Sequence, residues 1–254
     1  MGRFTFIFFM AIGTFSVLPT DAYGQGRGRG APAAPRTAKE AAPIDLTGYW
    51  VSIVTEDWRY RMVTPPKGDY VGVPLNPAGR KIADSWDPAK DEAAGEQCKS
   101  YGAANILRVP GRVHITWQDD QTLKLETDAG TQTRLFYFGA PQSQGGDWQG
   151  VSTASWEFLP ARPGSNVDRS SGSLKVVTTK FKSGYLRKNG VPYSANATLT
   201  EYFDRAVEPN GDTFLFVTRV VEDPTYLNAP FLLSEHFKKQ ADATGWNPTP
   251  CTAK

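Results

Sequence analysis

The chain has few of the residues from which metal and nucleophile sites are usually recognised. Its 254 residues include only two cysteines and two histidines, and these lie far apart in the sequence. The H-x-H, H-E-x-x-H and paired C-x-x-C spacings that hold zinc are missing. The phosphate-binding P-loop, the dinucleotide-binding G-x-G-x-x-G and the G-x-S-x-G turn of α/β-hydrolases are missing too. We therefore expect no metal site and no cofactor.

Long apolar runs are missing after the first 24 residues. The chain opens with a short basic start, Met1–Arg3, then an uncharged apolar run, Phe4–Leu18, then small residues up to Gly24. This order predicts a secretory signal peptide over residues 1–24, and the run is too short for a membrane anchor. A buried N-terminal helix is the alternative. No later stretch reaches about 18 uninterrupted apolar residues. We expect an exported protein, periplasmic or extracellular, with no stable membrane insertion after cleavage.

Neither sign of charge dominates the composition. The chain has 28 Lys and Arg against 26 Asp and Glu, a formal net charge of +2. This balance gives no field that would favour a nucleic acid or a membrane surface. The basic residues nearest the predicted leader lie in a Gly/Ala/Pro tract over residues 25–43, which cannot build a core. We interpret the tract as a disordered tether. RNA binding by its Arg-Gly pairs is the alternative, and export argues against it.

The two cysteines are expected to pair. Cys98 and Cys251 are far apart in sequence, and in an oxidising compartment such a pair is more typical of a disulfide than of a catalytic or metal site. Closing a loop of this length stabilises the fold by about 4–5 kcal/mol in the chain-entropy model.

Short β-type runs separated by Gly, Pro, Asn and Asp recur from Leu46 onward, and they predict an all-β sandwich or barrel. The expected strands are 48–55, 58–63, 112–117, 122–127, 133–138, 153–159, 174–181, 197–203 and 213–221. Asn76-Pro77 and Asp87-Pro88 predict two short helices, ending near Ser85 and Gln97, between the second and third strands. Without a repeat or compositional break, residues 44–254 are expected to form one domain with a small helical insertion.

Acid–base chemistry is the catalytic class that the remaining residues allow. His114, Glu157 and Glu201 fall on three predicted strands, and Glu201 shares its face with apolar neighbours. A His–carboxylate pair inside a barrel would supply a general base without a cofactor. The alternative places His114 in solvent or in one structural hydrogen bond. His236, in a C-terminal segment, is interpreted as a packing residue.

Aromatic residues make up 12% of the chain and could line a pocket for an apolar or aromatic ligand. Ordinary core packing is the alternative for each ring. In the segment 56–61, charges alternate with rings, and its arginines could bind a carboxylate or orient a carbonyl. The candidate substrate-binding residues are Trp50, Trp58, Tyr60, Arg61, Trp117, Arg134, Tyr137 and Trp156.

Gly48-Tyr49-Trp50, at the start of the first predicted strand, resembles the Gly-x-Trp that opens lipocalin-like (calycin) barrels. The resemblance implies an antiparallel β-barrel in which a late arginine, here Arg219, packs over Trp50. A disulfide from mid-chain to the C-terminus is also lipocalin-like.

A second resemblance covers residues 98–251. The segments that carry it are Gly150–Glu157, Thr178–Phe181, Ser194, Leu199–Phe203 and Asp223–Tyr226. They are similar to a pattern found in a group of uncharacterised secreted bacterial proteins. This likeness implies a secreted β fold and no particular reaction.

Together these observations predict a lipocalin-like antiparallel β-barrel with a small helical insertion. Two functions follow from them. One is a cofactor-free lyase, isomerase, cyclase or hydrolase that acts on a small apolar or aromatic molecule through His114, Glu157 and Glu201. The other is a periplasmic binding or carrier protein with the same pocket and no chemistry.

Overall fold

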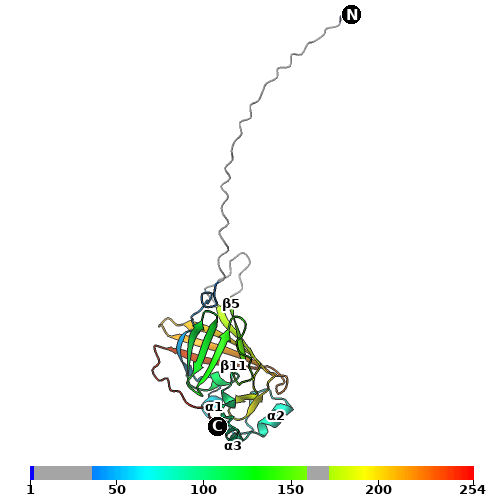
Figure 1. Cartoon of the computed structure of the whole chain (residues 1–254), viewed down its shortest axis with the longest axis vertical. Coiled ribbons are helices and arrows are strands. Elements are labelled where there is room, and N and C mark those ends of the chain that lie inside the picture. Colours follow the sequence, from blue (N-terminus) through cyan, green and yellow to red (C-terminus); the bar gives the residue numbers. More distant parts are fainter. Residues whose placement is uncertain (3–35, 159–171) are drawn as a thin grey trace. The chain divides into compact units, whose positions relative to one another are not determined.

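Strands with an inward apolar residue at every second position close into a barrel (Figure 1). The computed structural model describes residues 1–2, 36–158 and 172–254, and in these residues nine strands form the barrel. Most of the predicted signal peptide, and the predicted tether before residue 36, lie outside the described residues. Residues 36–254 form one compact unit.

The barrel order is β1-β11-β10-β9-β6-β5-β4-β3-β2. Its strands are β1 (Gly48–Ile53), β2 (Arg112–Asp119), β3 (Thr122–Thr127), β4 (Gln132–Tyr137), β5 (Val151–Phe158), β6 (Gly172–Thr179), β9 (Thr198–Val207), β10 (Thr213–Glu222) and β11 (Phe231–Gln240). Neighbours are antiparallel except β4 and β5, which meet in parallel over two residue pairs. The all-β barrel with a small helical insertion is therefore confirmed, with one parallel seam.

The helices gather at one end of the barrel (Figure 1). They are α1 (Trp58–Arg61), α2 (Pro77–Asp84) and α3 (Pro88–Ala93), followed by the 3-10 turns η1 (Gln97–Tyr101) and η2 (Ile106–Arg108). Asn76 and Asp87 cap α2 and α3 as their sequences predict, since each side chain accepts a hydrogen bond from a first-turn backbone N–H. Among the described residues, no helix has the length and hydropathy needed to cross a membrane.

The predicted strand over residues 58–63 is wrong. Asp57 adopts a left-handed backbone conformation (φ 50°), which ends the extended path of β1. The chain then makes a single helical turn, with Met62 N–H donating to the carbonyl of Trp58 at 2.9 Å. The alternation of rings and charges in this segment therefore does not place them on two strand faces.

Three strands were not predicted: the hairpin of β7 (Gly184–Arg187) and β8 (Val191–Tyr193), and the long barrel strand β11. In β11 the inward positions include a buried carboxylate, Glu235, next to Phe237. Leu232, in contrast, points outward and is exposed. Because a charged residue points inward and an apolar residue points outward, the strand lacks the alternation of apolar and polar residues on which strand prediction depends.

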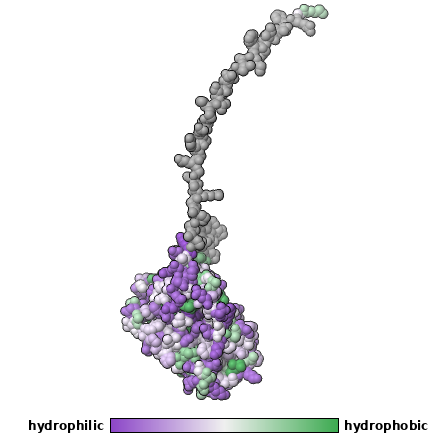
Figure 2. Space-filling model, in the orientation of Figure 1, coloured by the Kyte–Doolittle hydropathy of each residue, from purple (hydrophilic) through white to green (hydrophobic). Residues whose placement is uncertain are grey.

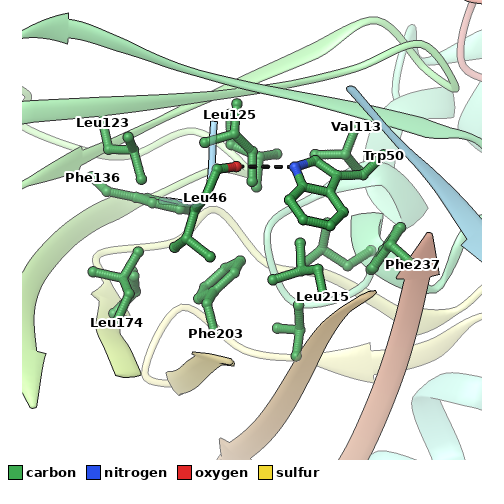
Figure 3. Packing of buried hydrophobic residues seen from close by; sticks show 14 of the residues in the cluster. Leu46, Trp50, Val113, Leu123, Leu125, Phe136, Leu174, Phe203, Leu215 and Phe237 are labelled. Atoms are coloured by element: carbon green, nitrogen blue, oxygen red, sulfur yellow. Dashed lines mark hydrogen bonds between the residues drawn. The ribbon is translucent and has the colours of Figure 1, made fainter. Parts of the chain in front are cut away.

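Apolar side chains fill the middle of the barrel (Figure 3). Trp50 is completely buried there, and its indole N–H donates to the Leu46 carbonyl at 2.9 Å. The side chain that packs over Trp50 is Lys239, and not Arg219 as expected. Lys239 Nζ lies over the ring, 5.4 Å from its centroid, while Arg219 is held by the buried Glu235.

The predicted disulfide is confirmed. Cys98 and Cys251 are bonded, with their Cα atoms 5.1 Å apart. The bond joins η1 to the last residues of the chain and spans 153 positions of sequence. It therefore ties the helical insertion and the C-terminus together at one end of the barrel.

Candidate functional site

The predicted catalytic residues do not converge. His114 points out of the barrel because Val113 and Ile115 take the inward positions of β2. Its ring stacks on Tyr49 at 3.9 Å between centroids, and Nδ1 lies 3.6 Å from Glu126. Glu157 is also on an outer face, in an ion pair with Lys175 at 3.1 Å. The expected contact of His114 with Glu157 or Glu201 is therefore not formed.

Glu201 and Arg134 are brought together inside the barrel. Arg134 makes two hydrogen bonds to the Glu201 carboxylate, of 3.0 and 2.5 Å. Arg219 Nε lies 3.5 Å from Glu201 Oε1, and Arg219 Nη1 lies 3.0 Å from Glu235. The Arg219 guanidinium also donates to the carbonyl of Ala104. Two arginines and two glutamates thus neutralise one another in a completely buried network.

The predicted aromatic residues separate into four places. Trp50 is a core residue, whereas Trp117 and Trp156 pack with Phe138 in a half-buried cluster. Tyr137 lines a small hollow of about 120 Å³ beside Arg134, next to the parallel seam. The remaining candidates, Trp58, Tyr60 and Arg61, all belong to α1.

A larger cavity of about 400 Å³ opens at the rim of the barrel; we call it the rim cavity. It arises because β1 is shorter than β11. Strand β1 pairs with residues His236–Gln240 only, so the preceding half of β11 has no β1 partner on that side. The cavity is lined by Glu56, Asp57, Tyr60, Val71, Gly72, Arg108, Arg187, Phe231, Leu232, Leu233, Ser234 and His236.

Two buried guanidinium groups form the polar wall of the rim cavity. Arg108, from η2, is 4% exposed, and Arg187, at the end of β7, is 2% exposed. They share one carboxylate, Asp57, at 3.0 Å from Arg108 and 4.0 Å from Arg187. The Tyr60 ring lies under Arg187, 4.2 Å from the guanidinium carbon. The nearby Arg61 has its own partner, Glu56. This wall therefore carries more positive than negative charge.

The electrostatics of Arg187 reflect this excess. Burial, followed by repulsion from Arg108, lowers the pKa of the Arg187 guanidinium, and Asp57 only partly opposes these effects. In the part of the chain described by the structure, Arg108 Nη2 and Arg187 Nε have no hydrogen-bond partner. Guanidinium groups that lose water without gaining full pairing are costly, so a second anion at this wall would be stabilising.

The rim cavity also has an apolar lining. Phe231, Leu232 and Leu233 come from the half of β11 that β1 leaves unpaired, and Val71 comes from the loop before α2. Val71 and Leu232 are 70% and 64% exposed. In Figure 2, exposed hydrophobic residues appear as separate spots on a mostly hydrophilic surface. The cavity thus combines a cationic wall with apolar sides.

A hydroxyl, an imidazole and a carboxylate lie in line along one edge of the rim cavity. Ser234 Oγ is 3.2 Å from His236 Nε2, and His236 Nδ1 is 3.5 Å from Glu56 Oε2. Ser234 and His236 are two positions apart on β11 and share its outer face. The edge of the imidazole ring also contacts Phe216, with centroids 5.0 Å apart.

Sequence reasoning found Tyr60 and Arg61 near this cavity but missed its main groups. Arg108 and Arg187 lie far apart in the sequence, and only the fold brings them to one wall. Ser234 and His236 did carry a signal, since an S-x-H spacing in a strand puts both side chains on one face. That signal depended on recognising β11 as a strand.

Comparison of the chain with protein-family models, curated proteins and solved structures finds no match.

Proposed function

We propose that this protein binds a small organic anion with an apolar or aromatic body in the rim cavity, as an exported binding or carrier protein. The observation that carries the proposal is the pair of buried guanidinium groups, Arg108 and Arg187, which share the single carboxylate of Asp57 at the cavity wall. The barrel-interior site predicted from the sequence has less support, because His114 lies outside it.

The anionic part of the ligand follows from charge. Two guanidiniums in one place can hold a carboxylate, sulfonate or phosphate through short charge-assisted hydrogen bonds. The unmatched positive charge is already desolvated in the folded protein, so the cost of burying it falls on folding and not on binding. We expect electrostatic recognition to supply much of the affinity.

The apolar part of the ligand follows from the apolar lining of the cavity. Phe231, Leu233 and the exposed Leu232 offer a surface for a ring or a short chain, and Tyr60 adds an aromatic face beside Arg187. A volume of about 400 Å³ lies within the usual range of small-molecule sites. A compact aromatic acid fits this description.

Export is part of the proposal. The disulfide, which spans 153 positions of sequence, suits an oxidising compartment, and the N-terminal sequence predicts a signal peptide. A binding protein outside the cytoplasm would capture its ligand without needing a cofactor.

The test is calorimetric titration with 2-naphthoate and with its neutral analogue 2-naphthamide. We expect the acid to bind at least tenfold more tightly than the amide. Arg187→Gln should weaken 2-naphthoate binding by about 10- to 100-fold, because a hydrogen bond to a charged group contributes about 1.5–3 kcal/mol. Arg205→Gln is the matched control, since Arg205 is bonded to the Asp45 carbonyl away from the rim cavity.

A second variant is expected to increase affinity, a result that loss of folding could not produce. Asp57→Asn removes the carboxylate that competes for the guanidiniums, and asparagine tolerates the left-handed backbone at this position. We expect several-fold tighter binding of 2-naphthoate. Equal affinity for acid and amide, or tight binding that neither variant changes, would contradict the proposed function.

A further inference from the structure

The Ser234–His236–Glu56 alignment has the connectivity of a nucleophile, a base and an orienting carboxylate. Ser234 Oγ lies 3.2 Å from His236 Nε2, within hydrogen-bond reach of a nucleophile and its base. The other imidazole nitrogen, Nδ1, faces Glu56 Oε2 at 3.5 Å. The carboxylate therefore favours the tautomer with a proton on Nδ1, which leaves Nε2 free to accept the serine proton.

Glu56 is itself held in position. One of its oxygens accepts from the Arg61 guanidinium, and the other accepts from the Thr55 hydroxyl at 2.8 Å. Arg61 is buried and is anchored by the Ser52 hydroxyl at 2.8 Å. The carboxylate thus has a defined orientation toward His236, as a positioning residue requires.

His114 gives a comparison within the same molecule. It also lies near a carboxylate, Glu126, at 3.6 Å, but its ring stacks flat on Tyr49. His236 differs because its partner hydroxyl, its carboxylate and the two guanidiniums all line one cavity. A nucleophile, a base and cationic groups able to stabilise an oxyanion therefore open onto the same space.

We propose that the rim cavity hydrolyses carboxylic esters of small apolar or aromatic acids, with Ser234 as the nucleophile. This inference rests on the proposed function, because the acid released is the organic anion that the guanidinium wall is proposed to bind. Ser234 Oγ attacks the ester carbonyl carbon while its proton passes to His236 Nε2. The carbonyl oxygen becomes an oxyanion, which faces Arg108 and Arg187.

The remaining steps balance without a cofactor. Collapse of the oxyanion breaks the bond to the alcohol oxygen, which takes the proton from His236 and leaves as the free alcohol. A water molecule then attacks the acyl–serine ester and gives its proton to His236. The second collapse releases the carboxylic acid, and the proton on His236 returns to Ser234 Oγ.

The experiment combines a covalent label with turnover. The full chain is treated with a fluorophosphonate, and the modified peptide is identified by mass spectrometry. Hydrolysis of 4-nitrophenyl butyrate is followed in parallel. We expect the label on Ser234, its loss in His236→Asn, and turnover in Ser234→Ala that equals the uncatalysed rate. His236→Asn should lower kcat by about 10²–10⁴-fold.

Two further variants make the result specific. An exposed imidazole can itself cleave activated esters, so His114→Asn is the matched histidine variant and should leave labelling and turnover unchanged. Glu56→Gln should lower kcat with little change in KM, and Glu56→Asp should restore part of the loss. A purely structural role for Glu56 would not produce that split.

The outcomes separate this inference from the proposed function. Absence of label on Ser234, or turnover in Ser234→Ala equal to that of the unmodified protein, overturns the hydrolase. Binding of 2-naphthoate to Ser234→Ala is titrated independently. If it persists while turnover is absent in every protein, the cavity is a binding site without chemistry.

Discussion

Buried charged side chains are the residues that decide how this barrel works. Glu201, Arg134, Arg219 and Glu235 lie inside it, and their charges balance one another. Arg108 and Arg187 lie at its rim with only Asp57 between them. The first group balances its own charge within the packed interior, whereas the second is unbalanced and therefore suits an anionic ligand.

The balanced group gives a stability prediction. Glu201→Gln removes the charge that compensates Arg134 and Arg219, and we expect a loss of about 3–5 kcal/mol, the usual cost of breaking a buried ion pair. Urea unfolding monitored by tryptophan fluorescence measures it. Glu157→Gln is the control, because Glu157 is partly exposed in a surface pair with Lys175, and its effect should stay within about 0.5 kcal/mol. Equal effects of the two changes would contradict this reading of the network.

Among individual residues, the environment of Glu201 was predicted from the sequence more accurately than that of His114. A carboxylate among apolar residues of one strand face predicts burial with a partner, and Arg134 is that partner. For His114, the sequence placed the residue on a strand but could not say which face of β2 points inward. The answer depends on barrel closure, a property of all nine described strands together.

Among the elements, the unequal lengths of β1 and β11 matter most for the site. The rim cavity exists because β1 ends at Ile53 while β11 continues for five residues beyond the His236 pair, toward Phe231. The α1 turn and the β7 end fill part of that gap with Tyr60 and Arg187. Eight of the nine described barrel strands were predictable from alternation, and the two helix caps from Asn76 and Asp87. The α1 turn was mistaken for a strand because its rings and charges alternate along a short segment.

The helical insertion gives a prediction of pH dependence. Hydrogen bonds from Lys99 and Lys182 lower the pKa of Glu96 below its ordinary value of 4.5. The folded state therefore favours the ionised carboxylate, so this stabilisation is complete above about pH 4.5 and is lost as the pH falls through the lowered pKa. We expect Glu96→Gln to reduce the melting temperature near neutral pH, with the difference from the unmodified protein shrinking on acidification.

Thermal melts of both proteins across the acidic range provide the measurement. Glu92→Gln, on the exposed side of α3, is the control and should show no such convergence. If the difference at Glu96 stays constant down to the lowest pH tested, its ion pairs with Lys99 and Lys182 do not contribute as the structure indicates.

At the scale of the whole molecule, the barrel is a filled scaffold and its open chemistry lies at the rim. The apolar residues of Figure 3 and the buried ion network occupy the interior. The disulfide joins the helical insertion to the C-terminal residues at one end of the barrel. The fold class could be predicted because the alternation of apolar and polar residues is visible within each strand. The disulfide could be predicted because the chain has only two cysteines. The rim cavity could not, because its residues come from five separate segments.

The most direct test of the central claim is a crystal structure of the protein soaked with 2-naphthoate. The account predicts difference density in the rim cavity, with the carboxylate within about 3 Å of the Arg108 and Arg187 guanidiniums and the rings against Phe231 and Leu233. Density for the ligand in the hollow beside Arg134 and Tyr137, or density in the rim cavity with the carboxylate turned away from both arginines, would contradict it.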